Sequence, residues 1–237
     1  MSEYTQNSMG LHGDLSFYEK LMSLPLFHGV TSDAITDFAE HTALEFRKYS
    51  KGDIIVRSGE VCREVICLIS GSITTRRILH TLDLAIHEFI DAGHIISADR
   101  LHGRNPVYQY DVIANSDVGI MIFSKRELMR LLQSNDIALM NWLNMISASA
   151  HRSSAALAGA KYNSCSELLW SLLEGFTEPA AKTIEIQLNQ MEDSPKLGPD
   201  DIEFLKPLVK SGMVKIENNK TIRIYDRALG LKLLANS

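Results

Sequence analysis

The chain has 237 residues, of which 45% are hydrophobic and 22% are charged, with 24 Lys and Arg against 29 Asp and Glu. This composition is that of an ordinary globular protein and excludes a disordered or collagen-like chain. At about 100 to 200 residues per domain, the length predicts one large or two modest domains. The formal net charge of −5 gives no support to nucleic-acid binding, which usually needs a basic face.

The start of the chain is polar and lacks the basic and then apolar layout of a signal peptide. No stretch approaches the roughly 18 apolar residues that span a bilayer. We therefore expect a cytoplasmic protein without a membrane partner. Cys62, Cys67 and Cys165 form neither a CxxC pair nor a disulfide framework, so we expect reduced thiols.

Two short helices are predicted first. Ser16 and Glu19 form a capping-box pattern ahead of a helix that Pro25 ends. A second helix follows Gly29, with Thr31 or Ser32 as its cap.

Residues 44–123 are predicted to be rich in β-structure. Short runs of β-branched and aromatic residues are interrupted about every 8 to 12 positions by turn residues, which is typical of a sandwich or barrel. The expected strands are residues 53–56, 64–69, 72–77, 82–90, 108–114 and 118–123.

A second capping box, Ser124 with Glu127, begins a further helix. A long helix is then predicted over residues 136–160, about 37 Å at roughly 1.5 Å per residue. Its apolar stripe has many small neighbours, which favours packing against another helix, although packing on its own domain is the alternative. The stripe comprises Ile137, Met140, Leu143, Ile146, Ala150 and Leu157.

Beyond residue 160 the composition changes again, and we place a domain boundary there. Ser164 and Glu167 form a third capping box for a helix that continues to Phe176. The remaining predicted elements are a strand over 183–188, a short polar piece over 189–194, a helix over 200–210 and a β-hairpin formed by 213–217 and 221–225.

Several short motifs follow one another in a defined order. They are Leu24-Pro25-Leu26-Phe27 with Gly29, Lys51-Gly52-Asp53 followed by Gly59-Glu60, the run from Val65 through Gly71 to Ile73, and Lys210-Ser211-Gly212 before Thr221 to Asp226. In this order the chain resembles the CRP/FNR superfamily of bacterial transcription regulators over nearly its whole length.

The resemblance implies an α+β fold in three parts. A jelly-roll-like β-roll of the cyclic-nucleotide-binding type with flanking helices would occupy residues 14–134, a dimerisation helix 135–160, and a winged helix-turn-helix 161–237. It also implies a homodimer that binds a near-palindromic DNA site under the control of an effector, with RNA polymerase as a further candidate partner. The sequence shows no set of nucleophile, acid and base, so we do not expect an enzyme.

The expected effector pocket departs from the cyclic-nucleotide pattern. Cyclic-nucleotide members of the family use a Gly-Glu pair and a downstream Arg, because a buried phosphate needs a cation and amide donors. Residues 93–99 lack the Glu and residues 107–112 lack the Arg, so a cyclic nucleotide is not expected unless Arg100 or Arg104 compensates. The candidate pocket residues are His94, Ser97, Asp99, Arg100, Tyr108 and Tyr110.

The cofactor is left unknown at this point. An iron–sulfur cluster needs about four thiolates, more than the cysteines available. Haem stays open because histidines lie in or beside the roll, although a lone histidine is more often an ordinary polar residue. These histidines are His41, His80, His87, His94 and His102. No metal site is expected, since the paired HxH spacing is absent.

The DNA-reading end also departs from the family pattern. A recognition helix usually presents Arg to guanine, but here the helix begins with Asp200 and Asp201, Glu203 takes the position of the second Arg, and Pro207 would kink it. Residues 177–237 contain nine basic and nine acidic side chains. The candidate DNA-contacting residues are Lys196, Asp200, Asp201, Glu203, Lys206, Lys210, Lys215, Lys220 and Arg223.

The leading hypothesis is a CRP/FNR-like regulator whose effector is not a cyclic nucleotide. The alternative is a sensor or protein-interaction module whose winged helix no longer binds DNA, which the acidic cluster at residues 200–203 favours. A cupin-type metal enzyme is a minor alternative.

Overall fold

The computed structural model describes residues 15–80, 83–158, 165–188, 209–210, 212–217 and 221–234. The chain enters through α1 (Leu15–Met22), the short 3-10 helix η1 (Pro25–Phe27) and α2 (Ser32–His41). Thr31 caps α2 as predicted, because its side chain accepts a hydrogen bond from the backbone N–H of Ala34 at 3.4 Å. Helix α1 begins at Leu15, so the prediction that Ser16 caps it was wrong: Ser16 lies inside the first turn.

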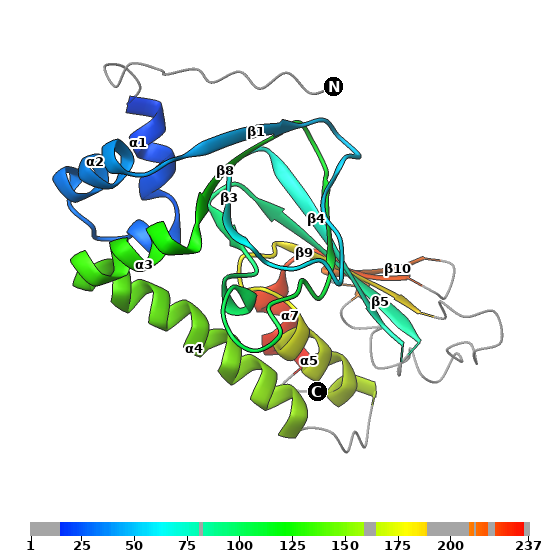
Figure 1. Ribbon diagram of the computed structural model, residues 1–237. Coiled ribbons are helices and arrows are strands. Elements are labelled where there is room, and N and C mark those ends of the chain that lie inside the picture. Colours follow the sequence, from blue (N-terminus) through cyan, green and yellow to red (C-terminus); the bar gives the residue numbers. More distant parts are fainter. Residues whose placement is uncertain are drawn as a thin grey trace.

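The β-roll is built from two sheets (Figure 1). One has the order β1-β8-β3-β6 and the other includes β5-β4-β7-β2, and all pairings are antiparallel. The first sheet comprises β1 (Glu45–Tyr49), β3 (Glu64–Ser70), β6 (His94–Ile96) and β8 (Val118–Ser124). The second includes β2 (Ile54–Val56), β4 (Ser72–Leu79), β5 (Leu84–Asp91) and β7 (Asp111–Ala114).

The core of the roll lies between these sheets. Its buried members include Val65, Leu68, Ile73, Ile86, Ile90, Val112, Ile120 and Phe123. Each of the six predicted strands is present, with ends that differ by up to three residues, whereas β1 and β6 were not predicted. The fold is therefore a β-sandwich with several helices packed around it.

One glycine of the family-like motifs is required by local geometry. Gly71, in the turn between β3 and β4, has φ of +80°, a left-handed conformation that side chains disfavour. A Cβ atom there would lie 2.2 Å from the carbonyl oxygen of Asp117. The turn thus depends on glycine for both conformation and space.

Two helices follow the roll, α3 (Lys125–Ser134) and α4 (Asp136–Ala158). The capping box at Ser124 is confirmed, since its hydroxyl accepts from the Glu127 N–H at 3.2 Å and the Glu127 carboxylate accepts from the Ser124 N–H at 2.9 Å. Helix α4 runs along one side of the roll (Figure 1). It is fixed to η1 by Asn141, whose amide donates to the carbonyls of Leu26 and His28 at 3.1 and 2.8 Å.

The C-terminal part contributes α5 (Cys165–Phe176), β9 (Thr183–Leu188), β10 (Val214–Glu217), β11 (Thr221–Ile224) and α7 (Arg227–Leu234). Strands β10 and β11 form the predicted hairpin, and β11 pairs with β9. Strand β9 in turn pairs with β5 of the roll over its whole length, from Leu84 opposite Leu188 to Phe89 opposite Thr183. The roll and the C-terminal strands therefore share one seven-stranded sheet, in the order β10-β11-β9-β5-β4-β7-β2.

Other predictions for this part lie outside the described residues. They are the short piece at 189–194, the helix at 200–210 except for its last two residues, and the cap at Ser164. Helix α7 was not predicted. The division at residue 160 stays a prediction, and the ladder between β5 and β9 adds a connection across it that the sequence did not indicate. Among the described residues no helix has the length and apolar character to cross a membrane.

Candidate effector site

Two adjoining cavities lie where the roll, α4 and the segment after α5 meet. Each measures about 200 Å³. The first is lined by Arg77, Arg100, Gln109, Tyr110, Ser153 and Phe176 among others, and the second by Pro25, His94, Ile95, Met145, Pro179 and Ala180 among others. Asp99, Ser149, Arg152 and Glu178 line both, so these four side chains form the wall between the cavities.

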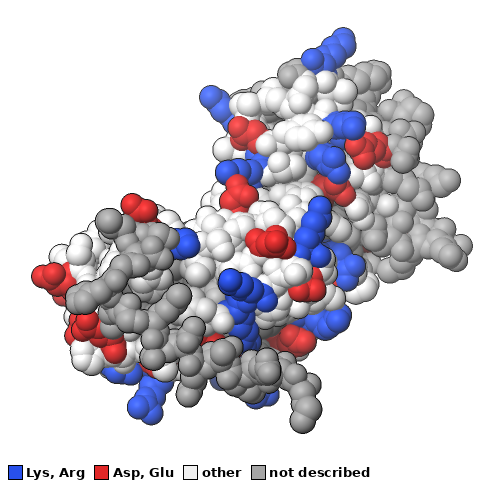
Figure 2. Space-filling view, turned by 90° about the horizontal axis from the view of Figure 1, so that it is seen from above, with Lys and Arg blue, Asp and Glu red and all other residues white. Residues whose placement is uncertain are grey.

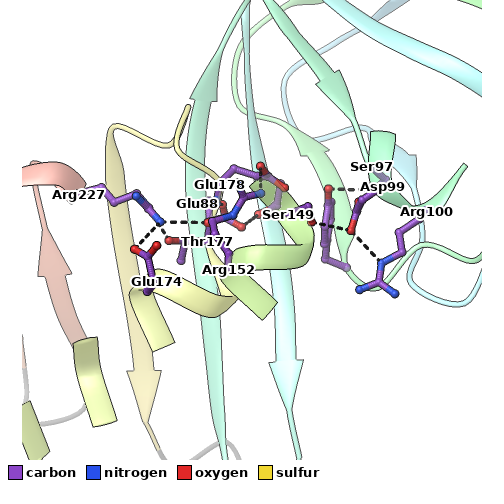
Figure 3. A network of polar contacts seen from close by, with 12 residues as sticks. Glu88, Ser97, Asp99, Arg100, Ser149, Arg152, Glu174, Thr177, Glu178 and Arg227 are labelled. Carbon is purple, nitrogen blue, oxygen red and sulfur yellow. Dashed lines mark hydrogen bonds and ion pairs between the residues drawn. The ribbon is translucent and has the colours of Figure 1, made fainter. Parts of the chain in front are cut away.

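The dividing wall is held together by polar contacts (Figure 3). The Ser149 hydroxyl donates to the Asp99 carboxylate at 3.0 Å, which fixes α4 to the short helix η2 (Ala98–Arg100) of the roll. The Arg152 guanidinium lies 2.9 Å from the Glu178 carboxylate, and Arg100 lies 3.2 Å from Asp99. Each carboxylate of the wall therefore has a cationic partner.

A buried carboxylate stands behind this wall. Glu88 on β5 is 1% exposed and accepts hydrogen bonds from the Thr75 hydroxyl at 3.0 Å and from the backbone N–H of Glu178 at 2.7 Å. Burial raises the pKa of Glu88 to about 7, although both hydrogen bonds favour its ionised form. Glu88 thus joins the roll to the segment after α5 and changes charge near neutral pH.

Arg77 on β4 occupies the first cavity in an aromatic setting. Its guanidinium carbon lies 5.0 Å from the ring centre of Tyr110 and 5.9 Å from that of Phe176, within the range of cation–π attraction. Its Nε atom is buried and has no hydrogen-bond partner. In the described part of the chain no ion pair joins Arg77 to a carboxylate.

Tyr110 is fixed from the other side by Ser97, whose hydroxyl donates to the tyrosine oxygen at 2.9 Å. Ser97 is buried and has φ of +51°, an uncommon conformation for a residue other than glycine. Burial raises the pKa of Tyr110 well above its ordinary value, so the phenol stays protonated. Burial likewise lowers the pKa of His94 in the second cavity, so this imidazole is neutral.

Four of the six predicted pocket residues, His94, Asp99, Arg100 and Tyr110, line these cavities. Ser97 lines neither cavity and contacts the site through its hydrogen bond to Tyr110, whereas Tyr108 lies away from it, beside Cys62. Sequence reasoning missed Arg77, Glu88, Arg152 and Glu178. Glu88 could have been found, because it occupies an inward-facing position between Ile86 and Ile90 of an apolar strand. The others come from β4, α4 and the segment after α5, which no sequence pattern brings together.

No cluster of three or more His, Cys, Asp and Glu side chains in the described residues has the spacing to hold a metal ion. Cys62 and Cys67 are buried free thiols, and burial raises the pKa of both. Such thiols stay protonated and unreactive at neutral pH.

The predicted dimer stripe lies mainly on the outer face of α4. The side chains of Ile137, Met140 and Leu143 are 44%, 54% and 46% exposed, and Ala150 is also exposed. Ile146 is half-buried and packs against the core of its own chain. The side chain of Leu157 lies outside the described residues.

Three of the predicted DNA-contacting residues are described. Lys210 is exposed, Lys215 lies 2.7 Å from Glu217, and Arg223 lies 2.5 Å from Glu185. The remaining six lie outside the described residues: Lys196, Asp200, Asp201, Glu203, Lys206 and Lys220. On the face seen in Figure 2, the described basic and acidic side chains are interspersed.

Comparison with known proteins identifies the class of domain to which the roll belongs. Residues 46–135, from β1 to the end of α3, match the family of the cyclic nucleotide-binding domain. The roll is therefore of the cyclic nucleotide-binding type, a description of its fold and not of its ligand. No curated protein matches the sequence.

Among solved structures, the chain is similar to the catabolite activator protein of Thermus thermophilus, with 14% identity, 90% of this chain and 99% of that chain covered, and a TM-score of 0.43. It is also similar to the sensor domain of the transcriptional regulator DNR from Pseudomonas aeruginosa, with 21% identity, 54% and 89% coverage, and a TM-score of 0.44. A third similar structure is the regulatory subunit of a cAMP-independent protein kinase A from Trypanosoma brucei, with 19% identity, 55% and 46% coverage, and a TM-score of 0.46.

Proposed function

We propose that this chain is a CRP/FNR-like transcription regulator that binds DNA as a homodimer and responds to an effector other than a cyclic nucleotide. The observation that supports this best is the position of the two cavities, which lie between a roll of the cyclic nucleotide-binding type, helix α4 and the segment leading to β9. A ligand there contacts all three parts. It can therefore favour one of their arrangements over another, as an effector must.

The charges at the cavities support an effector of another kind. Arg100, the candidate to compensate for the missing phosphate-binding Arg, is paired with the Asp99 carboxylate. Arg152, the other ion-paired guanidinium of the wall, belongs to α4 and is paired with Glu178. The arrangement differs from the family pattern, in which a Gly-Glu pair and a downstream Arg hold the cyclic phosphate.

The outer face of α4 supports the homodimer. Ile137, Met140 and Leu143 are large apolar side chains exposed on one helix face, and contiguous exposed apolar surface is typical of an interface. A second copy of this helix would bury all three residues against their equivalents, because a twofold interface places the same patch on both subunits.

The DNA half of the proposal is tested by selecting fragments from a genomic library with the full-length protein and measuring affinity by gel shift. We expect a near-palindromic site bound at least about 10³-fold more tightly than non-specific DNA. Lys210→Gln should weaken binding and reduce its salt dependence, since a phosphate contact releases counterions. Lys48→Gln, at an exposed lysine of β1, is the matched control and should leave affinity unchanged.

A second candidate function is a sensor without DNA binding. Its support is that Lys215 and Arg223, two cations of the hairpin, already contact Glu217 and Glu185. Selection that finds no site above non-specific affinity would favour this candidate over the regulator.

A further inference from the structure

In the lining of the first cavity, guanidinium groups outnumber carboxylates. Three guanidiniums, those of Arg77, Arg100 and Arg152, line it against the two carboxylates of Asp99 and Glu178. Arg100 contacts Asp99 and Arg152 contacts Glu178. Arg77 lies against two aromatic rings and is attracted to the buried Glu88 carboxylate, and its buried Nε atom has no hydrogen-bond partner. A cavity of this composition favours an anion, which would supply the missing partner.

The carboxylate of Glu178 already behaves as an internal anion at this place. It lies 2.9 Å from Arg152, and the two side chains are only 25% and 13% exposed. The backbone of Glu178 is held by Glu88, because the Glu178 N–H donates to the Glu88 carboxylate at 2.7 Å. An external anion that approaches both Arg77 and Arg152 must therefore displace the Glu178 side chain.

The position of Glu178 is also tied to the shared sheet. Only a few residues later, the Lys182 N–H donates to the Phe89 carbonyl at 3.2 Å, and its ammonium lies 2.6 Å from Asp91. Strand β9 then begins at Thr183 and pairs with β5. A shift of the segment after α5 is thus transmitted to the first residues of the β5–β9 ladder.

We propose that the first cavity binds a small organic anion, whose carboxylate or phosphate group pairs with Arg77 and Arg152, and that this anion competes with Glu178 and loosens β9 from β5. The inference rests on the proposed function, since it names the ligand class and the mode of regulation of the same site. The cavity of about 200 Å³ restricts the ligand to a small molecule, and guanidinium groups favour planar or tetrahedral oxyanions because they can donate two parallel hydrogen bonds.

The first test measures binding of two probes, succinate and inorganic phosphate, to the full-length protein by isothermal titration calorimetry. Glu178→Gln removes the internal competitor and keeps the backbone contact to Glu88. We expect it to bind a probe at least about fivefold more tightly than the wild type, as expected for loss of a partly buried ion pair. Arg152→Gln removes a cationic partner of the anion and should bind the probe at least about tenfold more weakly than the wild type. The affinity of Arg152→Lys should lie between those of the wild type and Arg152→Gln.

The opposite signs of these two changes separate the proposal from a purely structural role. Both variants break the same ion pair, so a structural role predicts that they change binding in the same direction. Glu45→Gln, which breaks the exposed pair with Arg47 on β1, is the matched control and should not change affinity. Binding of only one probe would support the proposal and identify the group recognised. If neither probe binds the wild type or Glu178→Gln, or if Glu178→Gln does not bind more tightly, the proposal is overturned.

The second test follows hydrogen exchange of the β9 amides with and without a saturating probe. We expect exchange at the beginning of β9, next to Lys182, to become at least about threefold faster, while β3 in the opposite sheet stays unchanged. Tight binding with no change at β9 would overturn the regulatory half. Neither test involves DNA, so failure here is distinguishable from failure of the gel-shift experiment.

Discussion

The buried carboxylate of Glu88 makes a specific prediction about stability and pH. Its ordinary pKa is 4.5, and burial in the folded protein raises this to about 7. Below pH 4.5 the Glu88 carboxyl is protonated in both the folded and the unfolded state, so it takes nothing from the free energy of unfolding. Between pH 4.5 and 7 this carboxyl ionises in the unfolded state but stays largely protonated in the folded state, so the free energy of unfolding falls as pH rises. At about 1.4 kcal/mol per pH unit, this group alone removes about 3 kcal/mol by pH 7.5.

The perturbation that tests this is Glu88→Gln, which keeps the shape and one acceptor oxygen but cannot ionise. We expect the difference in unfolding free energy between variant and wild type to shift by about 3 kcal/mol in favour of the variant between pH 4.5 and 7.5. Urea unfolding of both proteins at half-unit pH steps measures this difference. The contributions of the other titrating groups cancel, because they are the same in the two proteins. Glu64→Gln, at an exposed position of β3, is the control. Parallel curves for Glu88→Gln and the wild type would refute the reasoning.

Three further changes test the interface and the polar contacts. Met140→Asp should give monomers by light scattering, because a charge enters the expected seam of α4, whereas Met129→Asp, at another exposed methionine on α3, should not. Tyr110→Phe should lower the unfolding free energy by about 1 to 2 kcal/mol in urea, since Ser97 loses its buried partner. Arg227→Met should lower it by about 2 to 4 kcal/mol, because the buried guanidinium donates to Thr177 and to carbonyls at the end of α5.

The elements of the roll were predictable because their determinants are local. Turn residues and runs of apolar residues indicate β3, β4, β5 and β8 to within a few residues, and Ser124 with Glu127 fixes the start of α3. Strand β1 was missed because it is an edge strand whose side chains are largely exposed, so it has no apolar alternation to detect. Strand β6 has three residues, too few to show a period.

The site was only partly predictable, and the reason is again the range of the interactions. His94, Ser97, Asp99 and Arg100 belong to one short stretch, and a resemblance of sequence motifs located it. Of the residues that complete the site, Arg152 and Glu178 lie much further along the chain, and only the packing of α4 and the pairing of β9 bring them to it. Strand β9 was predicted from its alternation, but its partner could not be, since a strand's own pattern does not specify which edge it joins.

The pairing of β9 with β5 also limits how far the C-terminal part can move. Separation of the ladder would expose the backbone groups of β5 along an edge, and bare edges are both costly and prone to pair with other chains. Displacement of one ion pair at Arg152 is too weak to compensate for a full ladder, because a partly exposed pair contributes at most about 1 kcal/mol. An anion in the first cavity is therefore expected to loosen the beginning of β9, next to Lys182, and complete separation would require DNA or another partner that binds the released form.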